Sequence, residues 1–161
     1  MTEVDNVLKP IKISYEGNLD FNEIYKLIKK FLIDKKYDID EKEHNYSDSG
    51  SMKIKWEATQ NINDYIQFVM KIAIKSSSIK KVKLNKKEVL SGKFDIEIEA
   101  MINKDYQYYY SGKPIMKFFR ELFDYMIKQP EFNTLGRRLK EESYSLFDEI
   151  KSYLGIQKIN S

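Results

Sequence analysis

Hydrophobic and polar residues alternate almost without error between residues 93 and 102. Every second position in this stretch is apolar: Phe94, Ile96, Ile98, Ala100 and Ile102. Because successive side chains of a strand point to opposite faces, a period of two predicts a strand with one buried and one wetted face. The same alternation recurs in residues 11–15, 52–59 and 66–74, and more weakly in 37–46.

Short turns separate these predicted strands. Residues 47–50 contain Ser, Asp and Gly, with Gly50 free to take a positive φ, and residues 61–63 and 85–87 form the next turns. We expect Gly17 and Asn18 to end the first strand, and the serines at 76–78 to separate a short strand at 82–84. Consecutive strands joined by short turns pair in antiparallel fashion.

Three other segments repeat apolar residues with the helical period. Asp20 followed by Glu23 is typical of a capping box, and the helix that it predicts extends to about residue 34. A second helix is predicted over residues 114–128, ended by Pro130. A third follows over residues 135–154, with Gly155 as its C-cap.

These elements predict the α+β class, in one domain that covers residues 1–161 with an ordered core at about 8–156. We expect a single antiparallel sheet of five to six strands, covered on one face by three helices. The element order also resembles a helix-grip (START-like) arrangement, in which a curved sheet wraps a long C-terminal helix. A plain two-layer sandwich accounts for the same pattern.

The composition of the chain excludes several classes of functional site. The chain of 161 residues has no cysteine, which excludes disulfides, thiolate metal sites and thiol catalysis. The first residues lack the apolar core of a signal peptide, and no apolar run approaches the roughly 20 residues of a spanning helix. We therefore expect a cytoplasmic protein without a membrane span. The net charge of +3, from 28 basic and 25 acidic side chains, does not by itself indicate nucleic acid.

Residues with catalytic or metal-binding chemistry are few. His44 is the only histidine and lies in a polar stretch, where exposure to solvent is the simplest interpretation. Asp95, Glu97 and Glu99 form a carboxylate row on one strand face, as any solvated strand face can. No recognised metal-ligand spacing and no glycine-rich phosphate loop is present. We predict no catalytic residue, metal or cofactor, and the interpretation leans away from an enzyme.

The strongest local charge signal is a run of lysines without an acidic residue in positions 75–87. We predict that five of them contact an acidic partner along a sheet edge: Lys80, Lys81, Lys83, Lys86 and Lys87. Tyr108 and Tyr109 are predicted to anchor the same macromolecular partner. A nucleic acid is the alternative partner, because lysines bind phosphates and tyrosines stack on bases. Edge lysines also discourage sheet aggregation.

A different hypothesis makes the protein a carrier or sensor of an apolar small molecule. If the sheet curls around the last helix, large inward side chains would line a cavity instead of filling a core. The residues proposed for that cavity are Trp56, Phe68, Met70, Phe94, Phe118 and Phe119.

Several short segments occur in a particular order along the chain: 55–58 (Lys-Trp-Glu-Ala), 96–100 (Ile-Glu-Ile-Glu-Ala), 105–106 with Tyr110, 118–120 (Phe-Phe-Arg) and 123–124. In these segments the chain resembles a family of short, uncharacterised archaeal α+β proteins. The resemblance implies an archaeal, cytoplasmic protein and brings no activity with it.

Overall fold

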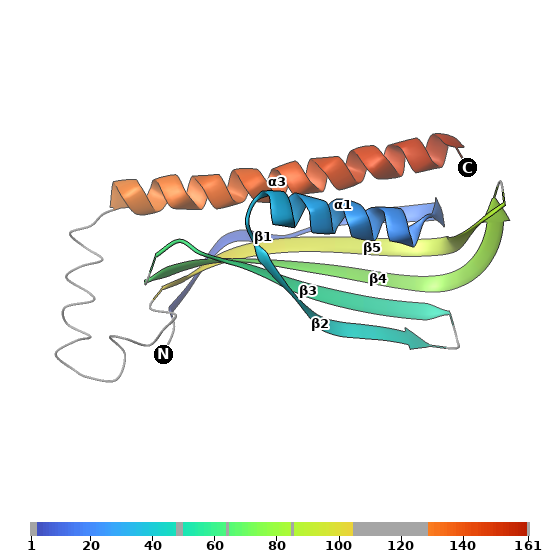
Figure 1. Ribbon diagram of the computed structural model, residues 1–161, viewed down its shortest axis with the longest axis horizontal. Helices are drawn as coiled ribbons and strands as arrows, with labels where there is room; N and C mark the ends of the chain where they lie inside the picture. The colour runs from blue at the N-terminus through green and yellow to red at the C-terminus, as the bar shows by residue number, and fades with distance from the viewer. Residues whose placement is uncertain (1–2, 48–49, 64, 85, 105–128, 161) are drawn as a thin grey trace.

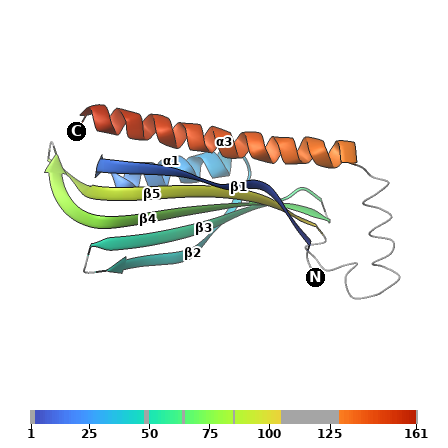
Figure 2. The ribbon, with the colours of Figure 1, turned by 180° about the vertical axis from the view of Figure 1, so that it is seen from behind.

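The fold is an antiparallel sheet with helices on one of its faces. The structure is a computed structural model, and it describes residues 3–47, 50–63, 65–84, 86–104 and 129–160. Five strands form the sheet in the order β1-β5-β4-β3-β2. The elements are β1 (Glu3–Leu19), α1 (Phe21–Asp34), β2 (Asp38–Ser47), β3 (Ser51–Asn61), β4 (Ile66–Leu84), β5 (Lys87–Lys104) and α3 (Gln129–Asn160). Figures 1 and 2 show α1 and α3 lying on the same side of the sheet.

The strand register explains why one face of the sheet is apolar. Ile54 of β3 lies opposite Ile74 of β4, which lies opposite Ile96 of β5. Ile96 in turn lies opposite Ile13 of β1, so isoleucines form a row across four strands. The row beside it contains Trp56, Ile72, Ile98 and Ile11. The predicted alternation is therefore confirmed.

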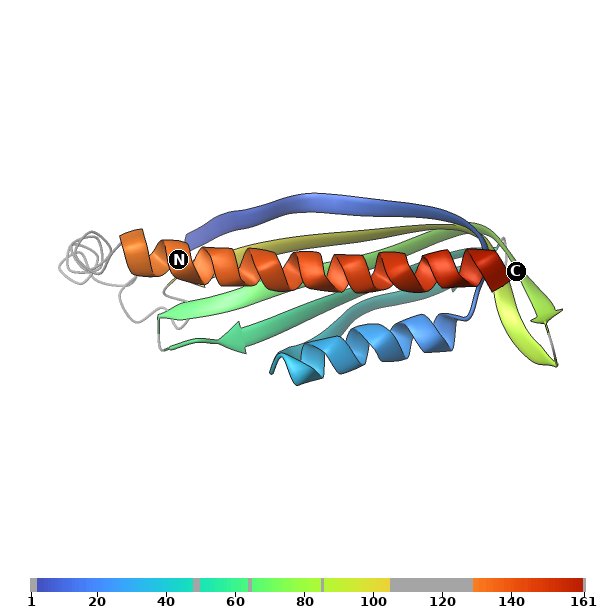
Figure 3. The same cartoon turned by 90° about the horizontal axis from the view of Figure 1, so that it is seen from above.

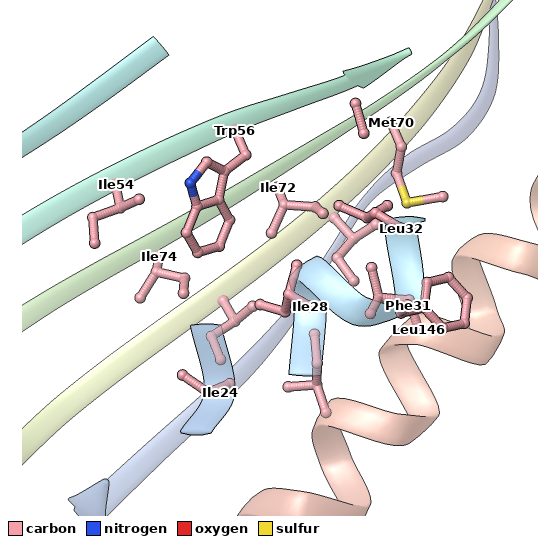
Figure 4. Packing of buried hydrophobic residues seen from close by; sticks show 14 of the residues in the cluster. Ile24, Ile28, Phe31, Leu32, Ile54, Trp56, Met70, Ile72, Ile74 and Leu146 are labelled. Carbon is pink, nitrogen blue, oxygen red and sulfur yellow. The ribbon is translucent and has the colours of Figure 1, made fainter. Parts of the chain in front are cut away.

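The two helices cover this apolar face. Figure 3 shows α3 running along the length of the sheet, with the shorter α1 beside it. Figure 4 shows buried side chains of α1, such as Ile24 and Ile28, next to Trp56 and Ile72 of the sheet. From α3, Leu139, Leu146 and Ile150 are fully buried. Burying each such aliphatic side chain contributes about 1.5–3 kcal/mol, so this two-layer packing holds the fold together.

Helix α1 begins and ends with defined caps. The Asp20 side chain accepts hydrogen bonds from the backbone N–H groups of Asn22 and Glu23, which confirms the predicted start. At the other end, Lys36 takes a φ of 68°, and Tyr37 N donates to Leu32 O at 2.8 Å. These are features of a Schellman motif, with lysine where glycine is usual.

The predicted strand boundaries were wrong at two places. β1 does not end at the expected turn, because Gly17 pairs with Gly92 and the strand continues to Leu19. The serines at 76–78 do not end a strand either. They lie inside β4, where a β-bulge between Ser77 and Lys80 absorbs the irregularity and the ladder continues. The sheet accordingly has five strands and not six.

Two helices are present among the residues that the structure describes, and the predicted helix over 114–128 lies outside them. The predicted C-cap at Gly155 was wrong, because α3 continues through it to Asn160. A glycine inside a helix costs only about 1 kcal/mol relative to alanine, so it does not have to end one. The described strand and helix also extend the expected core of 8–156 to Glu3 and Asn160.

Candidate functional site

The predicted partner-binding lysines lie on an arm that projects from the sheet. β3 accompanies β4 only as far as the pair Met52–Ser76, whereas β4 and β5 stay paired to Leu84–Lys87. On its other side β5 keeps β1 as a neighbour as far as the pair Leu19–Leu90, so only the last pairs, from Val82–Val89 to Leu84–Lys87, extend past both neighbouring strands. We call residues 80–84 and 86–89 the basic arm. Figures 1 and 2 show that it bends toward the helix side of the sheet. Beyond Ser76, β4 no longer has β3 as a neighbour. The predicted sheet edge is therefore confined to this last part of β4.

The bend starts at the β4 bulge. Ser78 has a φ of 56°, and Ile79 N donates to Gly50 O at 2.9 Å, which ties the bulge to the turn before β3. Opposite the bulge, a Cβ atom on Gly92 would lie 3.0 Å from the carbonyl oxygens of Ser77 and Ser78. The close approach of the two backbones therefore requires glycine at this position.

All five predicted lysines are exposed on the arm, but they are not equivalent. Lys87 forms ion pairs with Asp20 and Glu23, and Lys81 lies 3.8 Å from a carboxylate oxygen of Glu88. The other three have no carboxylate within 4.0 Å in the described part of the chain: Lys80, Lys83 and Lys86. Their charges are available to a partner.

Asp20 fixes the arm to the body of the protein. Its side chain is buried, caps α1 with one oxygen and pairs with Lys87 through the other. Its backbone carbonyl accepts a hydrogen bond from the Tyr153 hydroxyl of α3 at 3.3 Å. The hydrogen bond that Lys87 donates to the Asp20 carboxylate raises the pKa of Lys87 above its usual range. Lys87 therefore links the arm to the start of α1, a contact that the sequence did not reveal.

The positive charge of the arm continues on the wetted face of the sheet. Lys53 and Lys75 lie directly opposite each other on β3 and β4, and Lys93 is exposed on β5. Lys75 and Lys93 have no carboxylate within 4.0 Å among the residues described. Asp95 lies next to Lys75 in the register, but it accepts from Ser14 at 2.8 Å and pairs with Lys12 at 3.8 Å.

The predicted carboxylate row continues along β5 on the same outer face. Glu97 lies opposite Ala73, whose small side chain leaves a shallow hollow of about 300 Å³ between longer neighbours. Lys71 lies between Glu57 of β3 and Glu99 of β5, so the charges alternate across the strands. This pattern is typical of a solvated sheet face, since opposite charges on neighbouring strands attract.

His44 lies on the helix side of β2, opposite Ile54, with more than half of its side chain exposed. Its Nδ1 lies 3.0 Å from Glu41 Oε1. Within the described ranges, no three histidine or carboxylate side chains are placed to hold a metal ion.

Four of the six residues proposed for an apolar cavity lie in a packed core. Phe68, Met70 and Phe94 are 0–1% exposed, and Trp56 is 3% exposed. The Arg138 guanidinium of α3 covers the Phe68 ring at 5.3 Å, which adds a cation–π contact. This packing gives no support to a carrier built on these residues. The remaining predicted residues, Phe118, Phe119, Tyr108 and Tyr109, lie outside the described part of the chain.

No protein-family model and no curated protein matches this sequence. Among the described helices, none has the length and apolar character that crossing a bilayer would require. The interpretation of the basic arm therefore rests on its own geometry.

Proposed function

We propose that this chain is a non-catalytic binding protein that contacts an acidic macromolecular partner through its basic surface. By basic surface we mean the unpaired lysines of the arm and the adjoining sheet face, Lys75, Lys80, Lys83, Lys86 and Lys93. The observation that carries the proposal is that these exposed lysines have no carboxylate within 4.0 Å in the described residues, while Lys81 and Lys87 beside them do.

Uncompensated charge on a rigid protrusion favours encounter with a partner of opposite sign. A cluster of like charges raises the local concentration of an acidic partner and increases the association rate. The bulge and the Lys87–Asp20 ion pair connect the arm to the body of the protein.

The shape of the basic surface suits an extended partner. Lys75 and Lys83 are eight residues apart on β4, which corresponds to about 25 Å along the strand at roughly 3.3 Å per residue, and the bulge and bend between them shorten the direct distance. A single small anion would contact only a fraction of that length. An acidic protein segment matches it best, because no aromatic side chain for base stacking is exposed on the arm among the residues described.

Four finer assignments are also part of this proposal. The order β1-β5-β4-β3-β2, with a long C-terminal helix across the sheet, supports a helix-grip arrangement. The resemblance to archaeal proteins and the cytoplasmic location stay predictions from the sequence. Tyr108 and Tyr109 stay proposed anchors of the same partner.

Charge reversal tests the proposal. We expect the triple variant Lys80→Glu, Lys83→Glu, Lys86→Glu to bind a fluorescent polyglutamate peptide at least about tenfold more weakly than the original protein at low salt. The matched control reverses three exposed helix lysines, Lys26, Lys30 and Lys140, and changes the net charge by the same amount. We expect the control to lose less than about threefold.

The outcomes separate the alternatives. Equal losses in both variants, or no binding of polyglutamate by the original protein, would overturn the proposal. Preference for a DNA or RNA duplex over polyglutamate would identify the partner as a nucleic acid. In that case the slope of log K against log salt should fall by about 0.9 for each phosphate contact that is removed.

A further inference from the structure

A second hollow lies on the helix side of the sheet, between α1 and the strands β2 and β3. It has a volume of about 170 Å³. Ile28 and Leu32 of α1 and Ile39 of β2 provide apolar walls, and the Tyr25 ring and Trp56 line it from the two layers. Figure 4 shows Trp56 beside α1, among aliphatic neighbours that include Ile54, Ile72 and Ile74. The hollow is separate from the basic surface.

Trp56 brings an unused hydrogen-bond donor to this hollow. The residue is only 3% exposed, and its ring meets Tyr25 edge-on at 5.3 Å between centroids. The indole nitrogen is a donor only, and it has no hydrogen-bond acceptor in the described part of the chain. The nitrogen is not among the buried polar atoms that lack a partner, so solvent reaches it, and a ligand that supplies an oxygen or nitrogen lone pair would take the place of water here.

Glu41 supplies an acceptor at the same place. It lies directly opposite Trp56 in the β2–β3 register and lines the hollow. His44 Nδ1 lies 3.0 Å from Glu41 Oε1, so the imidazole engages one carboxylate oxygen. The other oxygen, Oε2, has no hydrogen-bond donor among the residues described. The hollow thus offers the Trp56 donor and the Glu41 acceptor beside apolar and aromatic walls. Lys29 of α1 also lines it and adds a charged donor, with its Nζ 6.0 Å from the centroid of the Tyr25 ring.

We propose that this hollow binds a small molecule with one aromatic ring and a hydroxyl group, a phenol-type ligand. An enclosed apolar cavity of about 150 Å³ accommodates benzene. This hollow has a similar volume of about 170 Å³ but is open to solvent on one side, so a single ring would fit and be partly enclosed. The hydroxyl group accepts from the Trp56 indole N–H and donates to Glu41 Oε2. The ring packs between Ile39 and the Tyr25 ring, where offset or edge-on contact is favourable.

The single tryptophan of the chain makes this proposal directly measurable. We would titrate ¹⁵N-labelled protein with phenol and follow the one indole Nε1–H resonance by NMR. A saturable shift of that resonance is expected. Toluene has a methyl group in place of the hydroxyl group and loses both hydrogen bonds. It should bind at least about tenfold more weakly, the factor that one hydrogen bond of about 1.4 kcal/mol already accounts for.

Two variants test the residues. Glu41→Gln should weaken phenol binding about tenfold, because a charged acceptor is the stronger one. The matched control, Glu43→Gln, changes a carboxylate that pairs with outer-face Lys55 and should leave binding unchanged. Ile39→Phe, which fills the hollow, should abolish the shift. The amide spectrum of each variant shows whether it is folded.

Three results would overturn the proposal. These are a shift that stays linear with phenol concentration, equal affinities for phenol and toluene, or equal effects of Glu41→Gln and Glu43→Gln. Because the basic surface uses none of these residues, each of these outcomes is independent of the test with polyglutamate.

Discussion

Lys87 Nζ lies 2.5 Å from the Asp20 carboxylate oxygen Oδ2, an ion pair between the start of β5 and the N-cap of α1. The same carboxyl group caps α1, and the backbone carbonyl of Asp20 accepts from Tyr153 of α3. One residue thereby joins the basic arm, the first helix and the last helix. The position of the arm depends on this connection.

Substitutions of Asp20 separate its two roles. Asp20→Ala removes the cap and the ion pair, and we expect the free energy of unfolding to fall by at least the ~1 kcal/mol that a helix cap contributes. Asp20→Asn keeps a capping oxygen but loses the charge, so its loss should be smaller. Urea unfolding measures both. If the two variants lose the same stability, the cap contributes nothing and this account of α1 is wrong.

The backbone crossing at Gly92 gives a second prediction. Gly92→Ala places a Cβ atom 3.0 Å from two carbonyl oxygens of the bulge, so we expect a loss of about 1–3 kcal/mol in unfolding experiments. The matched control is Gly136→Ala in α3, where nothing lies within 4 Å of the added Cβ atom. That change should stabilise the protein by about 0.5–1 kcal/mol. We therefore expect the two variants to change the free energy of unfolding in opposite directions. A Gly92→Ala variant with unchanged stability would contradict the close approach.

The sequence was sufficient to predict the faces of the sheet and the start of α1. Alternation at Phe94, Ile96 and Ile98 depends only on the period of a strand, and the capping residue Asp20 acts on its own neighbours. Such local signals need no knowledge of the rest of the fold. The lysine run was also visible, and its exposure follows from the cost of burying charge.

Long-range partners could not be predicted. The bulge that keeps β4 continuous depends on Gly92 of the next strand, and the glycine pair Gly17–Gly92 carries β1 past the expected turn. Likewise, nothing in a run of lysines distinguishes Lys87, which meets Asp20, from Lys86, which meets no carboxylate in the described residues. Only the strand register and the positions of the helices show which of these two lysines meets a carboxylate. The Glu41–Trp56 pair at the α1 hollow was missed for the same reason.

Stability at high pH should depend on Tyr37. This buried hydroxyl donates to Glu142 Oε2 at 2.8 Å, and burial, followed by the hydrogen bond and the charge of Glu142, raises the pKa of Tyr37 far above its usual value of 10.0. Above pH 10 the unfolded chain loses the tyrosine proton while the folded protein keeps it. The stability that is complete below pH 10 therefore decreases above it, by about 1.4 kcal/mol per pH unit for this group.

Unfolding experiments between pH 9 and about 11 measure this effect. Tyr37→Phe should have a smaller pH slope than the original protein, because the shifted group is gone. Tyr46→Phe is the matched control, since Tyr46 is 56% exposed. Identical slopes for the original protein and Tyr37→Phe would show that the Tyr37 hydroxyl is not held as described.

Truncation of a central side chain tests whether the interior is packed. Phe94→Ala should cost about 3–5 kcal/mol in urea unfolding, because Phe94 is 1% exposed in the apolar core and a cavity would remain. The exposed Val4, truncated to alanine, is the control and should change stability by less than about 0.5 kcal/mol. A loss below about 1 kcal/mol at Phe94 would favour a loosely filled interior, and with it the carrier hypothesis.

The central claim is that the basic surface is where this protein meets an acidic partner. The most direct measurement is an NMR titration of the ¹⁵N-labelled protein with a short polyglutamate peptide, which reports the perturbation of each backbone amide. Our account predicts saturable shifts concentrated in residues 75–93, with Lys80, Lys83 and Lys86 among the largest, and their loss at high salt. Shifts centred on the lysines of α1 or α3 instead, or spread evenly over the whole surface, would contradict it.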